Sequence, residues 1–393
     1  MHHLIFSVVS LLFLIFPGVS SFSCNTYRKT AKTELNGKTR RDIFSIAGVG
    51  LTSSVFSYPL SAHATSVEPL ADLPMIRLKL PKNAGVGRDY VVIQLNIDGK
   101  GPYKFMIDSG LTTEMITPHL KDILNIHGDN VVIRGHGAGG GEDNPLVELK
   151  GASLCCGKFR ENKTSMPLPP LHAIVTDFPQ EHIDPRHDVE GMIGVEFLEL
   201  FDVEFDFPNE RVRLWPPQKS PKNGLVAIPA VIMNESGLEG IRIRSPQQAI
   251  AQPMLGIIDC GSSMSIANLP AAKLLGLPLD PKEYKSPTVM GIGVDGKPLL
   301  MPTATVQFSF AGNAYQGSSP NDLRFEDPPS KFKPWDKVSL AIGDLPVFRD
   351  LLGDGKSEYT MPTVLVGLDI LAQRRIILES GKGRARRIFV APQ

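Results

Sequence analysis

The chain is poor in cysteine, in aromatic residues and in net charge. It has four cysteines in 393 residues, which is too few for the dense disulfide framework of a small secreted domain. Lysine plus arginine equals aspartate plus glutamate at 41 each, so no basic excess favours a nucleic-acid partner. The apolar run at residues 4–16 is too short to span a bilayer comfortably.

Glycine and proline are plentiful instead, at 36 and 33 residues. Short alternating apolar and polar runs are frequent, whereas helical periodicity is limited to stretches such as Pro118 to Leu124 and Leu269 to Leu275. This composition predicts an all-β body in which helices are minor elements.

One short pattern occurs twice. Phe105 to Gly110 reads FMIDSG and Gly256 to Gly261 reads GIIDCG, so each copy has apolar residues, an Asp, a small residue and a Gly. The strand-like run holds the Asp away from water, and the glycine permits a sharp turn and a close approach of the other copy. One such tripeptide is common at strand ends, but two with matching surroundings indicate a repeat.

The surroundings do match. Each Asp is followed by a glycine-rich segment, at residues 135–141 and 291–296, and then by two apolar residues and a glycine, at 192–194 and 365–367. After each of these glycines a hairpin is expected, over 201–215 and 374–390. The repeat therefore covers a whole domain plan.

This plan resembles that of the aspartic peptidases, with the retropepsin-like lobe used twice in one chain. The resemblance implies an all-β fold of two acid-protease lobes with an intramolecular active-site cleft. We expect lobes at residues 75–216 and 226–393, joined by a proline-punctuated linker at 217–225. The implied activity is that of an aspartic endopeptidase that acts on peptides or proteins and needs no cofactor and no metal.

The resemblance assigns roles to individual residues. Asp108 and Asp259 would be the catalytic pair: two adjacent carboxylates share one proton, and together they activate a water against the scissile carbonyl. The active-site loops would be supported by Ser109, Gly110, Cys260, Gly261 and Ser262. The flaps over the substrate would contain Gly135, Gly137, Gly139, Gly291, Ile292 and Gly293.

Cys260 departs from the family pattern, which has a hydroxyl residue after the Asp. Ser109 keeps that hydroxyl in the first copy, but a thiol is a weak hydrogen-bond donor, so we expect a looser brace between the loops. An alternative function is therefore a catalytically weak or inactive peptide-binding protein of the same fold.

Other features leave alternatives open. Residues 137–141 could be a phosphate-binding loop, although no Gly-Lys-Ser/Thr follows, or a plain surface loop. The adjacent Cys155 and Cys156 could be a redox switch or two small residues at a strand end. His182 and His187 match no metal-ligand spacing. Residues 317–357 are interpreted as an extra polar stretch of the second copy.

Residues 1–64 are interpreted as a targeting region with three consecutive signals. The apolar run 4–16 precedes small residues at a signal-peptidase site, residues 22–38 resemble a plastid transit peptide, and Arg40-Arg41 begins a twin-arginine signal that ends at Ala62-His63-Ala64. This order of signals predicts that the protein is located in the plastid thylakoid lumen. The alternatives are the secretory pathway or a membrane anchor. We expect a mature form without a stable membrane anchor that is a monomer.

Overall fold

The computed structural model describes residues 14–15, 67–79, 89–127, 132–137, 140–177, 189–233, 237–248, 252–284, 289–292, 298–319, 322–353, 356–380 and 386–393. The predicted targeting region, residues 1–64, therefore lies outside the described residues, except for strand β1 (Leu14–Ile15).

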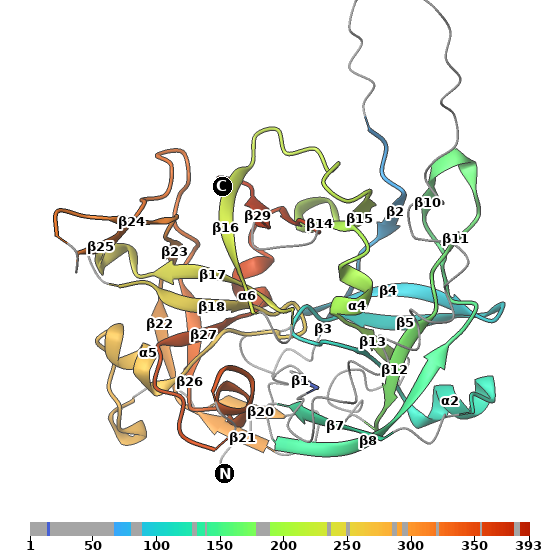
Figure 1. The fold of residues 1–393 in the computed structure, drawn as a ribbon, viewed down its shortest axis with the longest axis horizontal. Helices are drawn as coiled ribbons and strands as arrows, with labels where there is room; N and C mark the ends of the chain where they lie inside the picture. Colours follow the sequence, from blue (N-terminus) through green and yellow to red (C-terminus); the bar gives the residue numbers. More distant parts are fainter. Residues whose placement is uncertain are drawn as a thin grey trace, which may run out of the picture. The chain divides into compact units, whose positions relative to one another are not determined.

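The first lobe is built on an 11-stranded sheet (Figure 1). Its strand order is β1-β7-β8-β12-β6-β13-β5-β4-β9-β11, and β3 pairs with β4. After β1, the strands are β3 (Ile76–Lys79), β4 (Asp89–Ile97), β5 (Lys100–Ile107), β6 (Glu114–Ile116), β7 (Val132–Gly137), β8 (Gly140–Leu149), β9 (Ser153–Leu154), β11 (Met166–Pro167), β12 (Leu171–Val175) and β13 (Val189–Ile193).

A 14-stranded sheet runs from the first lobe into the second, in the order β10-β2-β15-β14-β28-β29-β16-β17-β18-β27-β19-β26-β22, with β23 on β17. The first-lobe strands are β2 (Ala71–Pro74), β10 (Lys158–Phe159), β14 (Asp202–Asp206) and β15 (Arg211–Trp215). The second-lobe strands are β16 (Val226–Ile232), β17 (Glu239–Arg244), β18 (Met254–Ile258), β19 (Ile266–Ala267), β22 (Thr303–Val306), β23 (Ser309–Phe310), β26 (Val338–Ile342), β27 (Thr363–Val366), β28 (Ile376–Leu378) and β29 (Arg387–Val390).

Two separate hairpins and a few short helices complete the described part of the chain. The hairpins are β20 (Val289–Ile292) with β21 (Pro298–Met301), and β24 (Ala314–Gln316) with β25 (Leu323–Phe325). The α-helices are α2 (Pro118–Leu124), α4 (Val195–Leu198), α5 (Leu269–Leu274) and α6 (Leu368–Leu371). The single-turn helices are η2 (Arg160–Asn162), η3 (Phe207–Asn209), η4 (Pro246–Gln248), η5 (Pro281–Glu283) and the π-helix η6 (Phe348–Leu352).

The sequence repeat is a repeat in strand topology. In the first lobe β5 pairs in parallel with β13, β13 pairs antiparallel with β6, and β6 pairs in parallel with β12. In the second lobe β18, β27, β19 and β26 repeat these three pairings in the same senses. The expected all-β fold of two acid-protease lobes with minor helices is confirmed.

Both predicted helices are present, and their caps explain where they begin. Thr117 precedes α2, and its side chain accepts a hydrogen bond from the N–H of Leu120. Asn268 precedes α5 and accepts from the N–H of Ala271. In both helices a proline occupies the first turn, where its missing N–H costs nothing. Helix α5 ends one residue before the predicted end.

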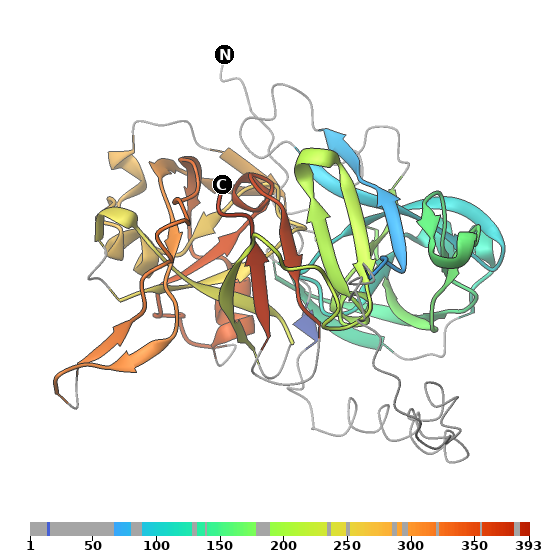
Figure 2. The ribbon, with the colours of Figure 1, turned by 90° about the horizontal axis from the view of Figure 1, so that it is seen from above.

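The interpretation of residues 317–357 as an extra polar stretch is wrong in part. Strand β26 belongs to the core sheet and corresponds to β12 of the first lobe. Trp335 is buried and packs edge-to-face on Phe332, which packs in the same way on Phe310. The hairpin β24–β25 pairs with no other described strand, and it projects from the second lobe in Figure 2.

The two lobes are joined by main-chain pairing and by a buried carboxylate. Strand β14 pairs antiparallel with β28. Asp202 at the start of β14 is fully buried, and it accepts hydrogen bonds from the N–H groups of Gln218, Ser220 and Ser380 and from the hydroxyls of both serines. Gln218 and Ser220 lie in the predicted linker, so one carboxylate ties the linker to both lobes.

Candidate active site

The two Asp loops occupy corresponding places in the two lobes. Asp108 follows β5 and donates its backbone N–H to Ile193 O at 2.9 Å, while Asp259 follows β18 and donates to Val366 O at 3.1 Å. In each loop the N–H of the glycine two residues on donates to Oδ1 of the Asp, at 2.8 Å for Gly110 and 3.1 Å for Gly261. Both carboxylates are fully buried and held by their own loops.

The loop glycines bring the two carboxylates together. A methyl carbon built on Gly110 would lie 3.0 Å from Cγ of Asp259. One built on Gly261 would lie 2.1 Å from Cγ of Asp108. Each carboxylate therefore packs on the glycine of the opposite lobe, in space that any side chain at that position would fill.

This proximity changes the protonation of the pair. Burial, followed by the adjacent Asp259 carboxylate, raises the pKa of Asp108 well above its usual range, against the lowering effect of the Gly110 and Gly261 N–H groups. Among the described residues no donor reaches Oδ2 of Asp108. Two buried carboxyls in contact are stable when they share one proton, so they titrate as a unit.

The brace between the loops depends on a single hydroxyl. Ser109 Oγ donates to Ile258 O at 2.9 Å and accepts the backbone N–H of Cys260 at 3.0 Å. The thiol Sγ of Cys260 lies 3.0 Å from the same Oγ as a donor. Burial raises the pKa of this thiol to about 12. Cys260 therefore remains a neutral thiol that contributes one weak hydrogen bond.

The apolar-apolar-Gly segments pack directly beneath the loops. Val195 N–H donates to Leu111 O at 2.7 Å, and Leu368 N–H donates to Ser262 O at 2.7 Å. A methyl carbon on Gly194 or on Gly367 would lie within 2.5 Å of a loop carbonyl oxygen. Ser262 also donates its hydroxyl to Met264 O, so it stabilises the turn of its own loop.

A tyrosine near the pair was not identified from the sequence. Tyr90 on β4 is fully buried, and its phenol is hydrogen-bonded to the side chain of Ser263. Burial raises the pKa of Tyr90 well above its usual value, and the Asp259 and Asp108 carboxylates add to this effect. Two features of the sequence could have indicated this contact: a tyrosine among aliphatic residues in the first hairpin, and a second serine after Gly261.

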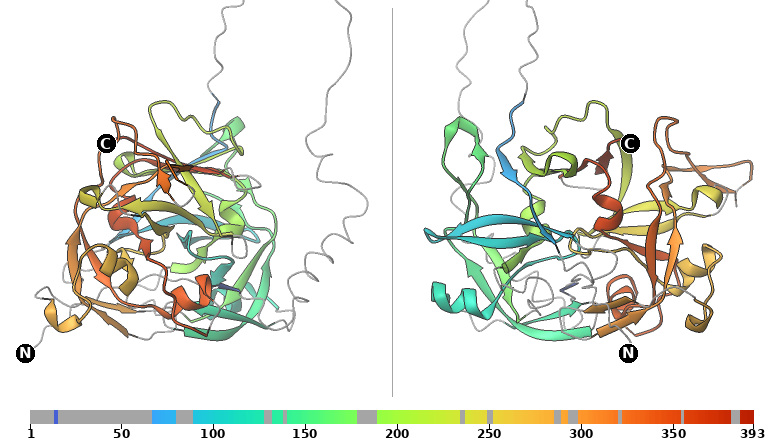
Figure 3. Two further views of the ribbon diagram at one scale, coloured as in Figure 1. Left: turned by 60° about the vertical axis from the view of Figure 1, so that its left-hand side comes forward. Right: turned by 180° about the vertical axis from the view of Figure 1, so that it is seen from behind.

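The predicted flap segments are β-hairpins in both lobes. Gly135 and Gly137 lie on β7, opposite Glu142 and Gly140 of β8. Gly291 and Ile292 lie on β20, opposite Leu299 and Pro298 of β21. Figures 1 and 3 show both hairpins on the same side of the two sheets. Gly139 and Gly293 lie outside the described residues.

The described residues contain no group of three or more His, Cys, Asp or Glu side chains placed to hold a metal. Of the polar loop near His182 and His187, only Val189 and Glu190 are described, and Glu190 accepts the hydroxyl of Thr117 and contacts His119 Nδ1 at 2.8 Å. None of the helices in the described ranges has the length and apolar character needed to cross a membrane.

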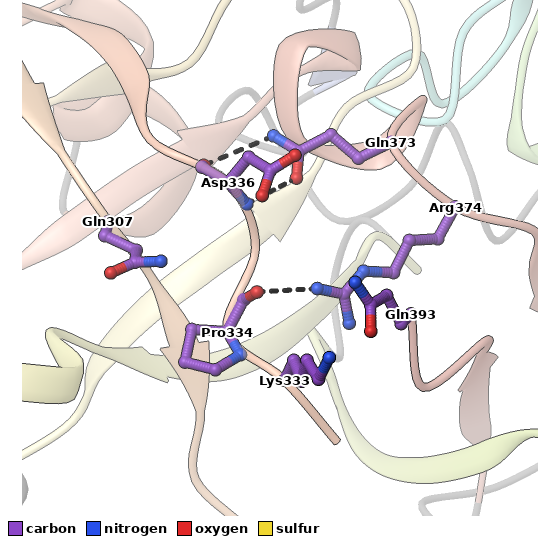
Figure 4. A pocket seen from close by; sticks show the side chains of 7 residues that line it. All are labelled: Gln307, Lys333, Pro334, Asp336, Gln373, Arg374 and Gln393. Atoms are coloured by element: carbon purple, nitrogen blue, oxygen red, sulfur yellow. Dashed lines mark hydrogen bonds between the residues drawn. The ribbon is translucent and has the colours of Figure 1, made fainter. Parts of the chain in front are cut away.

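A pocket of about 300 Å³ lies on the second lobe and contains neither catalytic candidate. Arg374 in its wall donates to Pro334 O (Figure 4). The same guanidinium donates to Pro392 O and stacks on Phe332. The remaining lining residues are Gln307, Lys333, Asp336, Gln373 and Gln393.

Comparison with known proteins finds one family model and, among solved structures, two related seed globulins. Residues 93–197 match the aspartyl protease family. Basic 7S globulin from soybean superimposes with a TM-score of 0.45 at 10% identity, over 82% of this chain and 94% of that one. Conglutin gamma from lupine seeds gives a TM-score of 0.41 at 11% identity, over 82% and 95%. No curated protein sequence matches the chain.

Proposed function

We propose that this chain, a member of the aspartic peptidase superfamily with two retropepsin-like lobes, is an aspartic endopeptidase. One observation carries the proposal: the buried carboxyls of Asp108 and Asp259 each pack on the loop glycine of the other lobe. This arrangement makes one shared proton the stable state at mildly acidic pH.

The proposed reaction uses both protonation states of the pair. The ionised carboxylate removes a proton from a water held between the two side chains, and the protonated carboxyl donates a hydrogen bond to the scissile carbonyl oxygen. The product of the attack is a tetrahedral diol, which collapses when the proton passes to the leaving amine. Because the two groups are coupled, the acid and base roles belong to the pair.

The substrate in this proposal is an extended peptide that lies across the carboxyls beneath the hairpins β7–β8 and β20–β21. Main-chain hydrogen bonds would hold it like an added strand, with alternate side chains on opposite sides. The enzyme would act as a monomer, because one chain supplies both Asp loops.

The test is cleavage of a mixed peptide library at about pH 5 by the full chain and by residues 65–393, beside Asp108→Asn and Asp259→Asn. We expect cleavage by the parent and its loss in either variant, with the fold checked by circular dichroism. A folded parent that cleaves nothing across the pH range would refute the proposal. Peptide binding by that parent would favour a non-catalytic binding protein, which the weak brace at Cys260 motivates.

We also propose that the protein acts in the plastid thylakoid lumen, after removal of residues 1–64. The support is the order of the three signals in the sequence. A fluorescent protein fused to the C-terminus would then accumulate inside thylakoids, and Arg40→Lys with Arg41→Lys would hold it in the stroma. Fluorescence in the secretory pathway or at a membrane would overturn the assignment.

A further inference from the structure

A second carboxyl pair lies under the Asp108 loop, where the second lobe has a hydroxyl and a single carboxylate. In the second lobe Ser265 Oγ donates to Asp369 Oδ1 at 2.7 Å and accepts the N–H of Gly367 at 3.0 Å. The corresponding positions of the first lobe, six residues after the catalytic Asp and two after the packing glycine, are Glu114 and Glu196. Two acids thus replace a donor and an acceptor.

Glu114 is fixed inside the lobe. It is 1% exposed, and its Oε1 accepts the N–H of Phe197 at 2.9 Å. No N–H or hydroxyl among the described residues reaches its Oε2, and the group beside it is the Glu196 carboxyl. Two ionised carboxylates in this position would repel each other, and because Glu114 is buried, solvent at the partly exposed Glu196 screens that repulsion only in part, so a proton on Glu114 stabilises the pair.

The surrounding groups decide which member holds that proton. On β12, His172 contacts Glu196 Oε1 through Nδ1 at 2.9 Å, and its backbone N–H donates to Glu196 Oε2 at 3.3 Å. On β13, Glu190 is occupied by Thr117 and by His119 of α2. Burial, followed by Glu196, raises the pKa of Glu114 well above its usual range. Glu114 therefore holds the proton.

This pair connects directly to the catalytic loop. Glu114 binds the N–H of Phe197 in α4, and the first residue of α4, Val195, donates to Leu111 O, three residues after Asp108. Gly194, just before α4, leaves no room for a methyl group against Leu111 O. A displacement of α4 would therefore move the Asp108 loop.

We propose that Glu114 and Glu196 form a proton-holding pair that positions the Asp108 loop while it keeps one proton and releases the loop when both carboxyls ionise. The inference rests on the proposed function, since it assigns the alkaline limit of peptide cleavage to this pair as well as to the catalytic carboxyls. Both glutamates are positioning residues, because they act on the reaction through α4 and Leu111.

Glu114→Gln provides the sharpest test. The amide oxygen can still accept the N–H of Phe197 and the amide nitrogen can donate to Glu196, so the variant imitates the protonated acid at every pH. We expect the alkaline limb of the pH profile of kcat/KM to move up by about one pH unit. The ratio of kcat/KM at pH 8 to kcat/KM at pH 5 would then rise about tenfold. Glu196→Gln is expected to act in the same direction. Glu190→Gln is the matched control, since its carboxylate pairs with a hydroxyl and a histidine.

Unfolding of the full chain, followed from pH 5 to pH 8, tests the pair without any activity. A raised folded-state pKa gives stability below the ordinary Glu value that is lost as pH rises, so the parent should lose stability across this range and Glu114→Gln should lose less. An unchanged alkaline limb in both variants would overturn the proposal, even with a flatter unfolding profile. If the parent cleaves nothing, the proposed function fails. Equal slopes of unfolding free energy against pH in the parent and Glu114→Gln would then also overturn the proposed proton-holding pair.

Discussion

Replacement of the two loop glycines should have unequal effects, and the difference follows from the distances. A methyl group on Gly261 would place carbon 2.1 Å from Cγ and 2.4 Å from both oxygens of Asp108. Non-bonded carbon atoms need about 3.5 Å or more, so this carboxyl must move by more than about 1 Å. A methyl group on Gly110 would lie 3.0 Å from Cγ of Asp259 and requires a shift of only a few tenths of an ångström.

Misplacement of a reacting group by about 1 Å costs on the order of a hundredfold in rate. We therefore expect Gly261→Ala to lower kcat/KM on a cleaved peptide about a hundredfold, and Gly110→Ala to lower it by about tenfold or less. Neither glycine has a left-handed φ, so the effects are steric and not conformational. Each variant should lose about 1–3 kcal/mol of stability through overpacking, measured by denaturant unfolding. An equal or larger loss of activity in Gly110→Ala would refute this reasoning.

Three further results are expected. In native protein the exposed Cys156 should react rapidly with a thiol reagent, whereas the buried Cys155 and Cys260 should stay protected, because burial raises the pKa of both thiols to about 12. Label on Cys260 in mass spectrometry would contradict this. Asp202→Ala should lower the free energy of unfolding in urea by about 3 kcal/mol or more, since it leaves buried donors unpaired. A loss below about 1 kcal/mol would show that the Asp202 hydrogen bonds do not hold the lobes together. Burial raises the pKa of Glu239 from 4.5 to about 7, so about 3 kcal/mol of stability should be lost as pH rises through that interval. Glu239→Gln should flatten the plot of unfolding free energy against pH, and equal slopes in parent and variant would contradict this.

Local patterns carried most of the information that the sequence supplied. A buried-strand run precedes both Asp108 and Asp259, and a glycine follows each Asp two residues later. Because this pattern occurs twice with matching surroundings, it indicated a repeated domain and so predicted the topology. Helix α2 could be located because Thr117 and Pro118 form a cap and a first turn. These signals depend on neighbours in the chain.

Contacts between distant segments could not be predicted in this way. Glu114 and Glu196 meet only because β6 and α4 pack together, and each glutamate alone resembles an ordinary surface residue. Strand β26 was misinterpreted because its five residues, four of them apolar, stand next to a long polar, proline-rich stretch, so composition hid a core strand. The pairing of β26 with β19 and β22 decided its place.

The order of the sheet strands has a consequence for synthesis. The carbonyl that supports the second Asp loop belongs to Val366, and the strands that close the shared sheet against β14 end at Leu378 and Val390. A ribosome must therefore translate more than a hundred codons beyond Asp259 before both carboxyls can be held together. A nascent chain carries both acids long before they can meet, so the newly made polypeptide lacks the carboxyl pair until its last strands emerge.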